Sequence, residues 1–79
     1  MPRGLNNWSA ADIIRFLKRR GFSHSHTRGS HFYYVGKVSG DDRQVCVPIH
    51  GKNAAIHPKT LKSIVRQSGI SESEWHSGE

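Results

Sequence analysis

The residues best suited to chemistry lie in one stretch, residues 28–34, with the sequence RGSHFYY. His31 is the one member that exchanges a proton near neutral pH without a special environment. Arg28 carries a planar guanidinium that suits phosphate, and Gly29 gives the chain freedom to turn. The aromatic residues that follow favour a β-strand. The stretch predicts a titratable group at the start of a strand beside a cation, although a plain hairpin turn with an exposed histidine has the same composition.

The composition is that of one small basic domain. Twelve Lys and Arg against six Asp and Glu give the 79 residues a net charge of +6, which favours a polyanionic partner, usually nucleic acid. An anionic membrane surface is the rival, but no basic segment carries the large apolar face that membrane binding needs. No segment is apolar enough for a signal peptide or a membrane span, and the single Cys46 cannot form an internal disulfide. We therefore expect a cytoplasmic protein with no membrane partner, and a domain at 9–76 between flexible tails at 1–8 and 77–79.

The first predicted helix covers residues 9–20. Ser9 is the expected N-cap, Asp12 approximates a capping box, and Gly21 is a natural stop. The apolar residues between them recur at spacings of three and four, which predicts one buried stripe.

A second helix begins at His57-Pro58, where the histidine is expected to cap it and the proline occupies the tolerated first turn. Gly69 ends this helix. Residues 71–74 form a capping box for one last helical turn. The chain therefore has helices at both ends of a central strand region.

Three strands are predicted between the helices, at 22–27, 31–38 and 43–49. A four-residue loop at 39–42 pairs Val38 with Arg43 and places His50 opposite His31. Because side chains alternate between faces, one face is apolar and faces the core. We expect this core to contain Phe32, Tyr34, Val45 and Val47, packed against Ile13, Leu17, Leu61, Ile64 and Val65. The other, open face carries His31, Tyr33, Val35, Lys37, Gln44, Cys46 and Pro48.

The histidines and the cysteine could form several kinds of site. His24 and His26 are two residues apart on a predicted strand, so they are expected to point the same way and to offer two metal ligands, but no third ligand is assured. Nucleophilic catalysis by Cys46 is poorly supported, because no acidic residue is placed to orient a histidine. His31 and His50 could act as acid and base on a phosphodiester. RNA supplies its own nucleophile, the 2′-hydroxyl, so such a site needs neither a metal nor a cofactor.

Four segments occur in a characteristic order: LKRRGF at 17–22, RGSH at 28–31, VCVPIH at 45–50 and KTLKSIVRQSGI at 59–70. Together they resemble the HicA toxin family of bacterial and archaeal type II toxin–antitoxin modules. The resemblance covers nearly the whole chain. It implies an α+β fold like that of a double-stranded-RNA-binding domain, in the order α-β-β-β-α, with both helices on one face of a three-stranded antiparallel sheet.

The resemblance also implies a function. The family's catalytic histidine falls on His31, in an endoribonuclease that cleaves mRNA and stops growth. A HicB-like antitoxin would cover the site, and DNA would be reached only through that antitoxin. His50 is the candidate helper, and the residues expected from their position to bind RNA are Arg28, Gly29, Ser30, Tyr33, Lys37 and Lys52. A non-catalytic double-stranded-RNA-binding domain is the main alternative, and a structural subunit that acts only with a partner is a weaker one.

Overall fold

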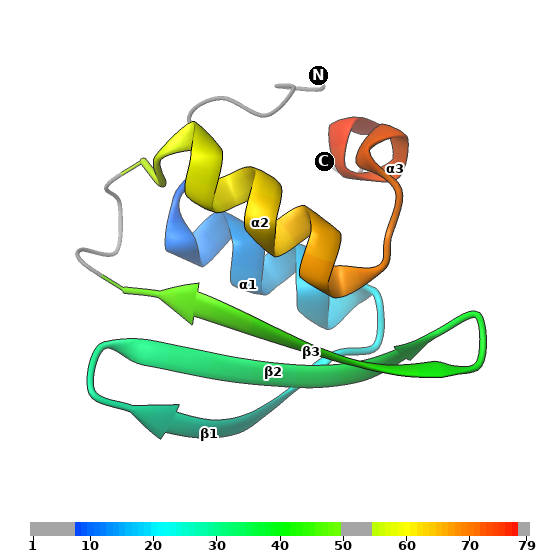
Figure 1. Ribbon diagram of the computed structural model, residues 1–79, viewed down its shortest axis with the longest axis horizontal. Coiled ribbons are helices and arrows are strands. Elements are labelled where there is room, and N and C mark those ends of the chain that lie inside the picture. The colour runs from blue at the N-terminus through cyan, green and yellow to red at the C-terminus, as the bar shows by residue number, and fades with distance from the viewer. Residues whose placement is uncertain (1–7, 50–54, 78–79) are drawn as a thin grey trace.

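The computed structural model describes residues 8–49 and 55–77. Its elements are α1 (Ala10–Arg19), β1 (Ser23–Arg28), β2 (His31–Val38), β3 (Asp41–Pro48), α2 (Pro58–Ser68) and α3 (Glu72–Ser77). The strands form one antiparallel sheet in the order β1-β2-β3, and α1 and α2 lie together on one side of it (Figure 1). The predicted fold class is therefore confirmed. The expected tails fall on residues 1–7 and 78–79, outside the described residues, apart from Trp8 and Ser77.

The helix ends follow the capping signals of the sequence. The Asp12 N–H donates to Ser9 Oγ at 3.2 Å, and the Ser9 N–H donates to Asp12 Oδ2 at 3.0 Å, which is a complete capping box. At α2, the Lys59 N–H donates to His57 Nδ1 at 3.1 Å, so His57 caps this helix as predicted. Gly69 ends it with a φ of 73°, a conformation that favours glycine. None of the helices in the described ranges is long and apolar enough to cross a membrane.

The core lies between the apolar face of the sheet and the helices. All nine residues expected there are buried except Phe32, which is half-buried. The structure adds an aromatic cluster that links the two ends of the chain. Trp8 contacts Phe16 and Trp75 with ring centroids 5.9 and 5.4 Å apart, and Phe16 stacks on Trp75 at 4.0 Å. Trp8 is fully buried, so it belongs to the core and not to a tail.

The register between β2 and β3 differs from the prediction by two residues. Val38 lies opposite Asp41, and His31 lies opposite Pro48 instead of His50. The reason is a two-residue turn, in which Ser39 and Gly40 have φ values of 53° and 83°. Positive φ at both central positions is typical of a type I′ turn, which matches the twist of a hairpin. A shift of two residues keeps every side chain on its predicted face, so the residues predicted to face the core still do so.

A β-bulge in β1 overturns a second prediction. His24 pairs with Tyr34 and His26 with Tyr33, so one extra residue, Ser25, lies between the two pairs. His24 consequently lies on the core side, with its ring 5.7 Å from that of Phe32, whereas His26 lies on the open side against Tyr33. The prediction that His24 and His26 point the same way is wrong. Among the described residues, no group of three or more His, Cys, Asp or Glu side chains is placed to hold a metal ion.

Candidate functional site

His31 lies at the β1–β2 hairpin, at the first position of β2. Gly29 has a φ of 59° at the first central position of the turn, as in a type II′ hairpin. The turn therefore places Arg28 and His31 directly opposite each other, and both side chains are exposed. The Ile49 N–H donates to the Ser30 carbonyl oxygen at 2.7 Å, which ties the turn to the end of β3. The predicted histidine and arginine thus stand side by side on an anchored turn.

The next row of the open face is aromatic. His26, Tyr33 and Cys46 lie opposite one another on the three strands. The His26 and Tyr33 rings are parallel, with 5° between their planes and 4.4 Å between centroids. The Ser25 hydroxyl and His26 Nδ1 lie 3.2 Å apart, which helps to orient the imidazole. This row forms a stacked pair of rings next to His31, and we call it the His26–Tyr33 pair.

Cys46 closes this row on the β3 side. A hydrogen bond with the Cys46 side chain raises the pKa of the Tyr33 phenol above its ordinary value, and the positive charge of Arg28 acts in the opposite direction. The Cys46 N–H donates to Gln67 Oε1 at 2.9 Å, so a side chain of α2 holds the outer edge of β3. Tyr33 therefore keeps its proton at neutral pH and offers a neutral ring and a hydroxyl to a ligand.

The structure brings together some of the predicted site residues and separates others. Arg28, Gly29, Ser30, His31 and Tyr33 gather at one end of the open face. Lys37 lies on the same face but six residues further along β2, about 20 Å from His31 at roughly 3.4 Å per residue. It is paired across the sheet with Asp42. The predictions for His50 and Lys52 fall outside the described residues.

His26 is a member of this site that the sequence did not reveal. By register it is a diagonal neighbour of His31, at a distance of about 7–8 Å for such pairs. Nothing in β1 could have shown this, because the strand SHSHTR has no apolar residue to fix which side chains face the core. The bulge at Ser25 is visible only in the three-dimensional structure.

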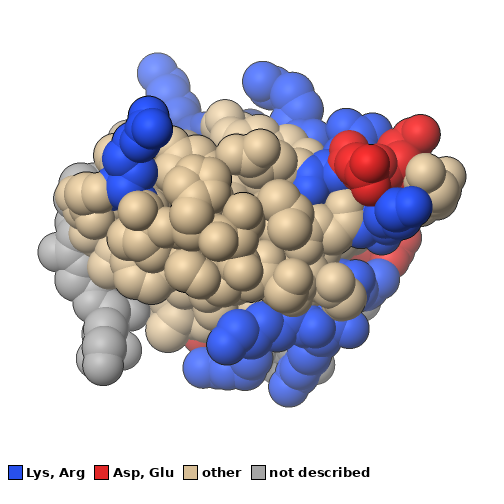
Figure 2. Space-filling view, turned by 90° about the horizontal axis from the view of Figure 1, so that it is seen from below, with Lys and Arg blue, Asp and Glu red and all other residues tan. Residues whose placement is uncertain are grey.

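The open face is neutral at its centre and basic at its margins. Figure 2, which views the molecule from the sheet side, shows a broad area without charged side chains, with Lys and Arg around it and some acidic side chains at its right-hand end. Arg28 stands at one end of β2 and Lys37 at the other, and between them the face presents the His26–Tyr33 pair, Val35 and other uncharged groups. Such a surface can pair a phosphate at the Arg28 end, and it can contact flat, uncharged groups further along β2.

Comparison with known protein families matches residues 10–70 to the family described as HicA toxin of bacterial toxin–antitoxin. The matched segment runs from the first residue of α1 to just beyond α2, and so contains the whole sheet with His31. A search of curated proteins finds no match to the chain. Because the family match covers well over half of the 79 residues, the chain belongs to the HicA toxin family of bacterial toxin–antitoxin systems.

Proposed function

We propose that this toxin is an endoribonuclease that cleaves mRNA and thereby stops translation and growth. Membership of a toxin–antitoxin family supports the toxic role and implies an antitoxin partner. The observation that carries the enzymatic part is the exposed His31 at the hairpin turn, directly opposite Arg28. An exposed histidine beside a guanidinium has the two properties that phosphodiester cleavage needs, proton transfer and stabilisation of negative charge.

The chemistry follows from the structure of RNA. The 2′-hydroxyl oxygen attacks the adjacent phosphorus while its proton passes to a base, and the bond to the 5′-oxygen breaks as an acid donates a proton to it. The products are a 2′,3′-cyclic phosphate and a 5′-hydroxyl. His31 performs one of these proton transfers, and Arg28 stabilises the charge on the phosphorane. His50, the helper expected from the sequence, is the candidate for the other transfer. No step requires a metal ion or a cofactor.

The antitoxin is expected to be HicB-like and to cover the open face. An exposed catalytic group on a toxin needs such a cover in the cell. A partner with acidic residues near Arg28 and Lys37 would match the basic margins of the face. DNA would be contacted only through the antitoxin.

A non-catalytic double-stranded-RNA-binding domain is the alternative. Three cations of α2, Lys59, Lys62 and Arg66, are exposed and could contact a duplex backbone. That function would not need a histidine beside an arginine on the opposite face of the sheet. It predicts binding of duplex RNA without cleavage.

The test is cleavage of a defined RNA in the presence of EDTA, followed by analysis of the ends. We expect wild-type protein to leave 2′,3′-cyclic phosphate and 5′-hydroxyl ends. His31→Ala should slow cleavage by about 10²–10⁴-fold, the usual contribution of a general acid or base. The fold should be retained, because His31 is exposed and supports no part of the core.

His24→Ala is the matched control. His24 is also an exposed histidine of this hairpin, but the bulge places it on the opposite side of the sheet. The His24→Ala variant should cleave RNA like wild type and remain toxic in cells. Full activity of His31→Ala would end the assignment of His31, and loss of wild-type cleavage in EDTA would exclude the metal-independent mechanism.

A further inference from the structure

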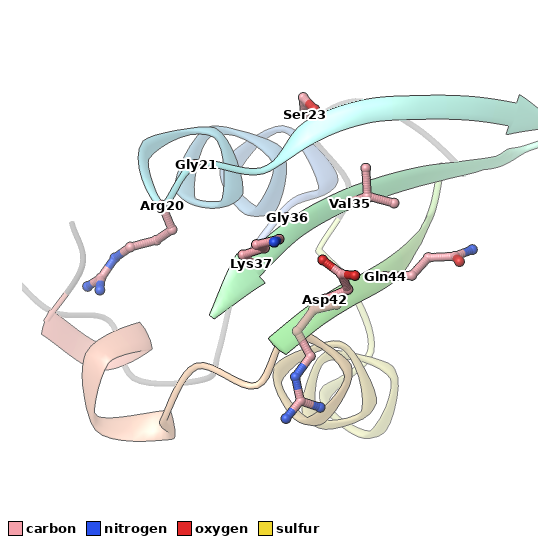
Figure 3. A pocket seen from close by; sticks show the side chains of 9 residues that line it. Arg20, Gly21, Ser23, Val35, Gly36, Lys37, Asp42 and Gln44 are labelled. Atoms are coloured by element: carbon pink, nitrogen blue, oxygen red, sulfur yellow. The ribbon is translucent and has the colours of Figure 1, made fainter. Parts of the chain in front are cut away.

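A hollow of about 780 Å³ lies on the sheet beyond the His26–Tyr33 pair. Pairing between β1 and β2 ends at Ser23 and Val35, so the last residues of β2 extend past the start of β1. The hollow occupies this step (Figure 3). Of the residues assigned to the candidate site, it includes Lys37 alone.

The hollow is lined by apolar and polar residues. Val35, which is 38 % exposed, is the large apolar residue among them. Figure 3 shows Asp42 and Gln44 of β3 beside Val35 and Lys37 of β2. Because hydrogen-bonding directions alternate along an antiparallel pair, the Lys37 N–H and C=O point away from β3, toward the free edge of β2. This combination suits a flat group whose faces are apolar and whose edges donate and accept hydrogen bonds.

The charges around the hollow argue against a phosphate as its occupant. Lys37 on β2 lies directly opposite Asp42 on β3, on the same face of the sheet. Arg20 forms an ion pair with Glu74, and in Figure 3 its side chain points away from Val35. The side chain of Arg43, which also borders the hollow, packs against Gly69 at the end of α2. Asp42 would repel an anion, whereas it can accept a hydrogen bond from a nucleobase.

The His26–Tyr33 pair lies between this hollow and His31. Tyr33 and Val35 are two residues apart on the same face, about 7 Å along the strand. The parallel rings of the pair are already stacked on each other, so a base can join the stack without reordering it. Along β2 the open face thus presents first His31, then the stacked rings of the His26–Tyr33 pair, and then the hollow at Val35.

We propose that the open face binds RNA as a single strand, with one base stacked on the His26–Tyr33 pair and another in the hollow over Val35, where Asp42 and Gln44 read its edge. A duplex presents its phosphates outward and hides the faces of its bases, so it does not match an uncharged aromatic surface. Unpaired bases stack on aromatic side chains of a sheet in other RNA-binding domains. The inference rests on the proposed function for where the strand is cut, but binding itself does not depend on cleavage.

Binding to RNA that cannot be cleaved tests whether the His26–Tyr33 pair stacks on a base. The probe is a mixed-sequence 2′-O-methyl single strand, compared with the same strand annealed to its complement, with wild-type protein and fluorescence anisotropy. We expect the single strand to bind at least about tenfold more tightly than the duplex, and His26→Ala or Tyr33→Ala to weaken it by on the order of 5- to 100-fold. His26→Phe and Tyr33→Phe, which keep a ring, should retain most of the binding that the alanine variants lose. His24→Ala, on the other side of the sheet, should bind like wild type.

Base preference tests the hollow. With 2′-O-methyl strands of A, C or U only, Asp42→Asn should change the ratio of the three affinities by on the order of tenfold. Asp41→Asn is the matched control, because the neighbouring Asp41 belongs to the other face of β3, and it should leave the ratios unchanged. Unchanged ratios in Asp42→Asn would remove the hollow as a base site.

Two other outcomes would overturn the inference as a whole. These are duplex binding as tight as that of the single strand, and ring-free variants of the His26–Tyr33 pair that bind like wild type. Failure of the proposed function is a different result: the wild-type protein would bind the single strand as described and yet leave an unmodified RNA uncut in the cleavage assay.

Discussion

The hydroxyl of Ser68 joins α2 to α3 at a fully buried position. It donates to the Val65 carbonyl oxygen at 2.7 Å, and it accepts from the Ile70 N–H at 3.1 Å and from Trp75 Nε1 at 3.3 Å. Trp75 is itself fully buried and stacks on Phe16. One small polar side chain therefore positions the indole that closes the aromatic cluster.

Ser68→Ala should reduce the free energy of unfolding by about 1–3 kcal/mol, because it leaves two buried N–H donors without their acceptor. Urea denaturation measures this change. Ser63→Ala on the same helix is the control. Ser63 is half-buried and accepts one hydrogen bond, from Gln67, so its loss should cost less than about 1 kcal/mol. Equal effects of the two substitutions would contradict the role assigned to Ser68.

The position of His31 at the hairpin turn could be predicted, and the position of His26 on the same face could not. Turn residues, an arginine and a following aromatic run mark His31 in the sequence itself. The place of His26 depends on the bulge in a strand without apolar residues, where both possible faces are equally compatible with the sequence. His26 and His31 carry the same imidazole group, but the path of the backbone decides on which face of the sheet each side chain lies.

At the level of whole elements, capping and alternation predicted more than turn geometry did. Both long helices begin and end within a residue of their predicted limits, because cap residues act locally. The faces of β2 and β3 were also predicted, since the two-residue period places Tyr34, Val45 and Val47 together on the side that the structure buries. The loop at 39–42 was misjudged, because its composition indicates a turn without fixing its length. Ser39 in a left-handed conformation is unusual for a serine and gave no sign in the sequence.

Gly36 shows how one strand accommodates its neighbour. A Cβ at this position would lie 2.8 Å from Phe22 Cγ and 3.1 Å from Phe22 Cα, closer than packed atoms allow. Phe22 is buried where α1 passes into β1, so it has little room to move. The absence of a side chain on β2 therefore allows the α1–β1 connection to pack against the sheet.

Gly36→Ala should destabilise the protein by on the order of 1–3 kcal/mol through overpacking, as measured by thermal or urea denaturation. Phe22→Ala should be destabilising through the loss of a buried ring. If the contact is the cause, the double variant should be less destabilised than the sum of the single ones, because removing the ring gives the new methyl group room. Strict additivity would place the effect of Gly36→Ala elsewhere.

For the whole molecule, the charge distribution affects the rate at which the antitoxin associates with the toxin. The net charge is +6. The centre of the open face is uncharged, and Lys and Arg outnumber the acidic side chains around it. Charges at the margin of an interface act over long distances on the approach of a partner, and an uncharged centre contributes contact area after docking. Electrostatics should therefore govern the association rate more than the dissociation rate.

The last prediction concerns this association rate. With an acidic antitoxin, it should fall by about tenfold or more as the ionic strength rises from about 0.01 M to about 0.15 M, because the Debye length shortens from roughly 30 Å to roughly 8 Å. The dissociation rate should change much less, and stopped-flow or surface-based kinetics separate the two. Arg28→Ala should lower the association rate at low salt, whereas Arg15→Ala should have a smaller effect, because Arg15 lies on the helix side of the sheet and pairs with Asp12 at 3.4 Å. An association rate that does not respond to salt would rule out electrostatic steering, while leaving the complex itself intact.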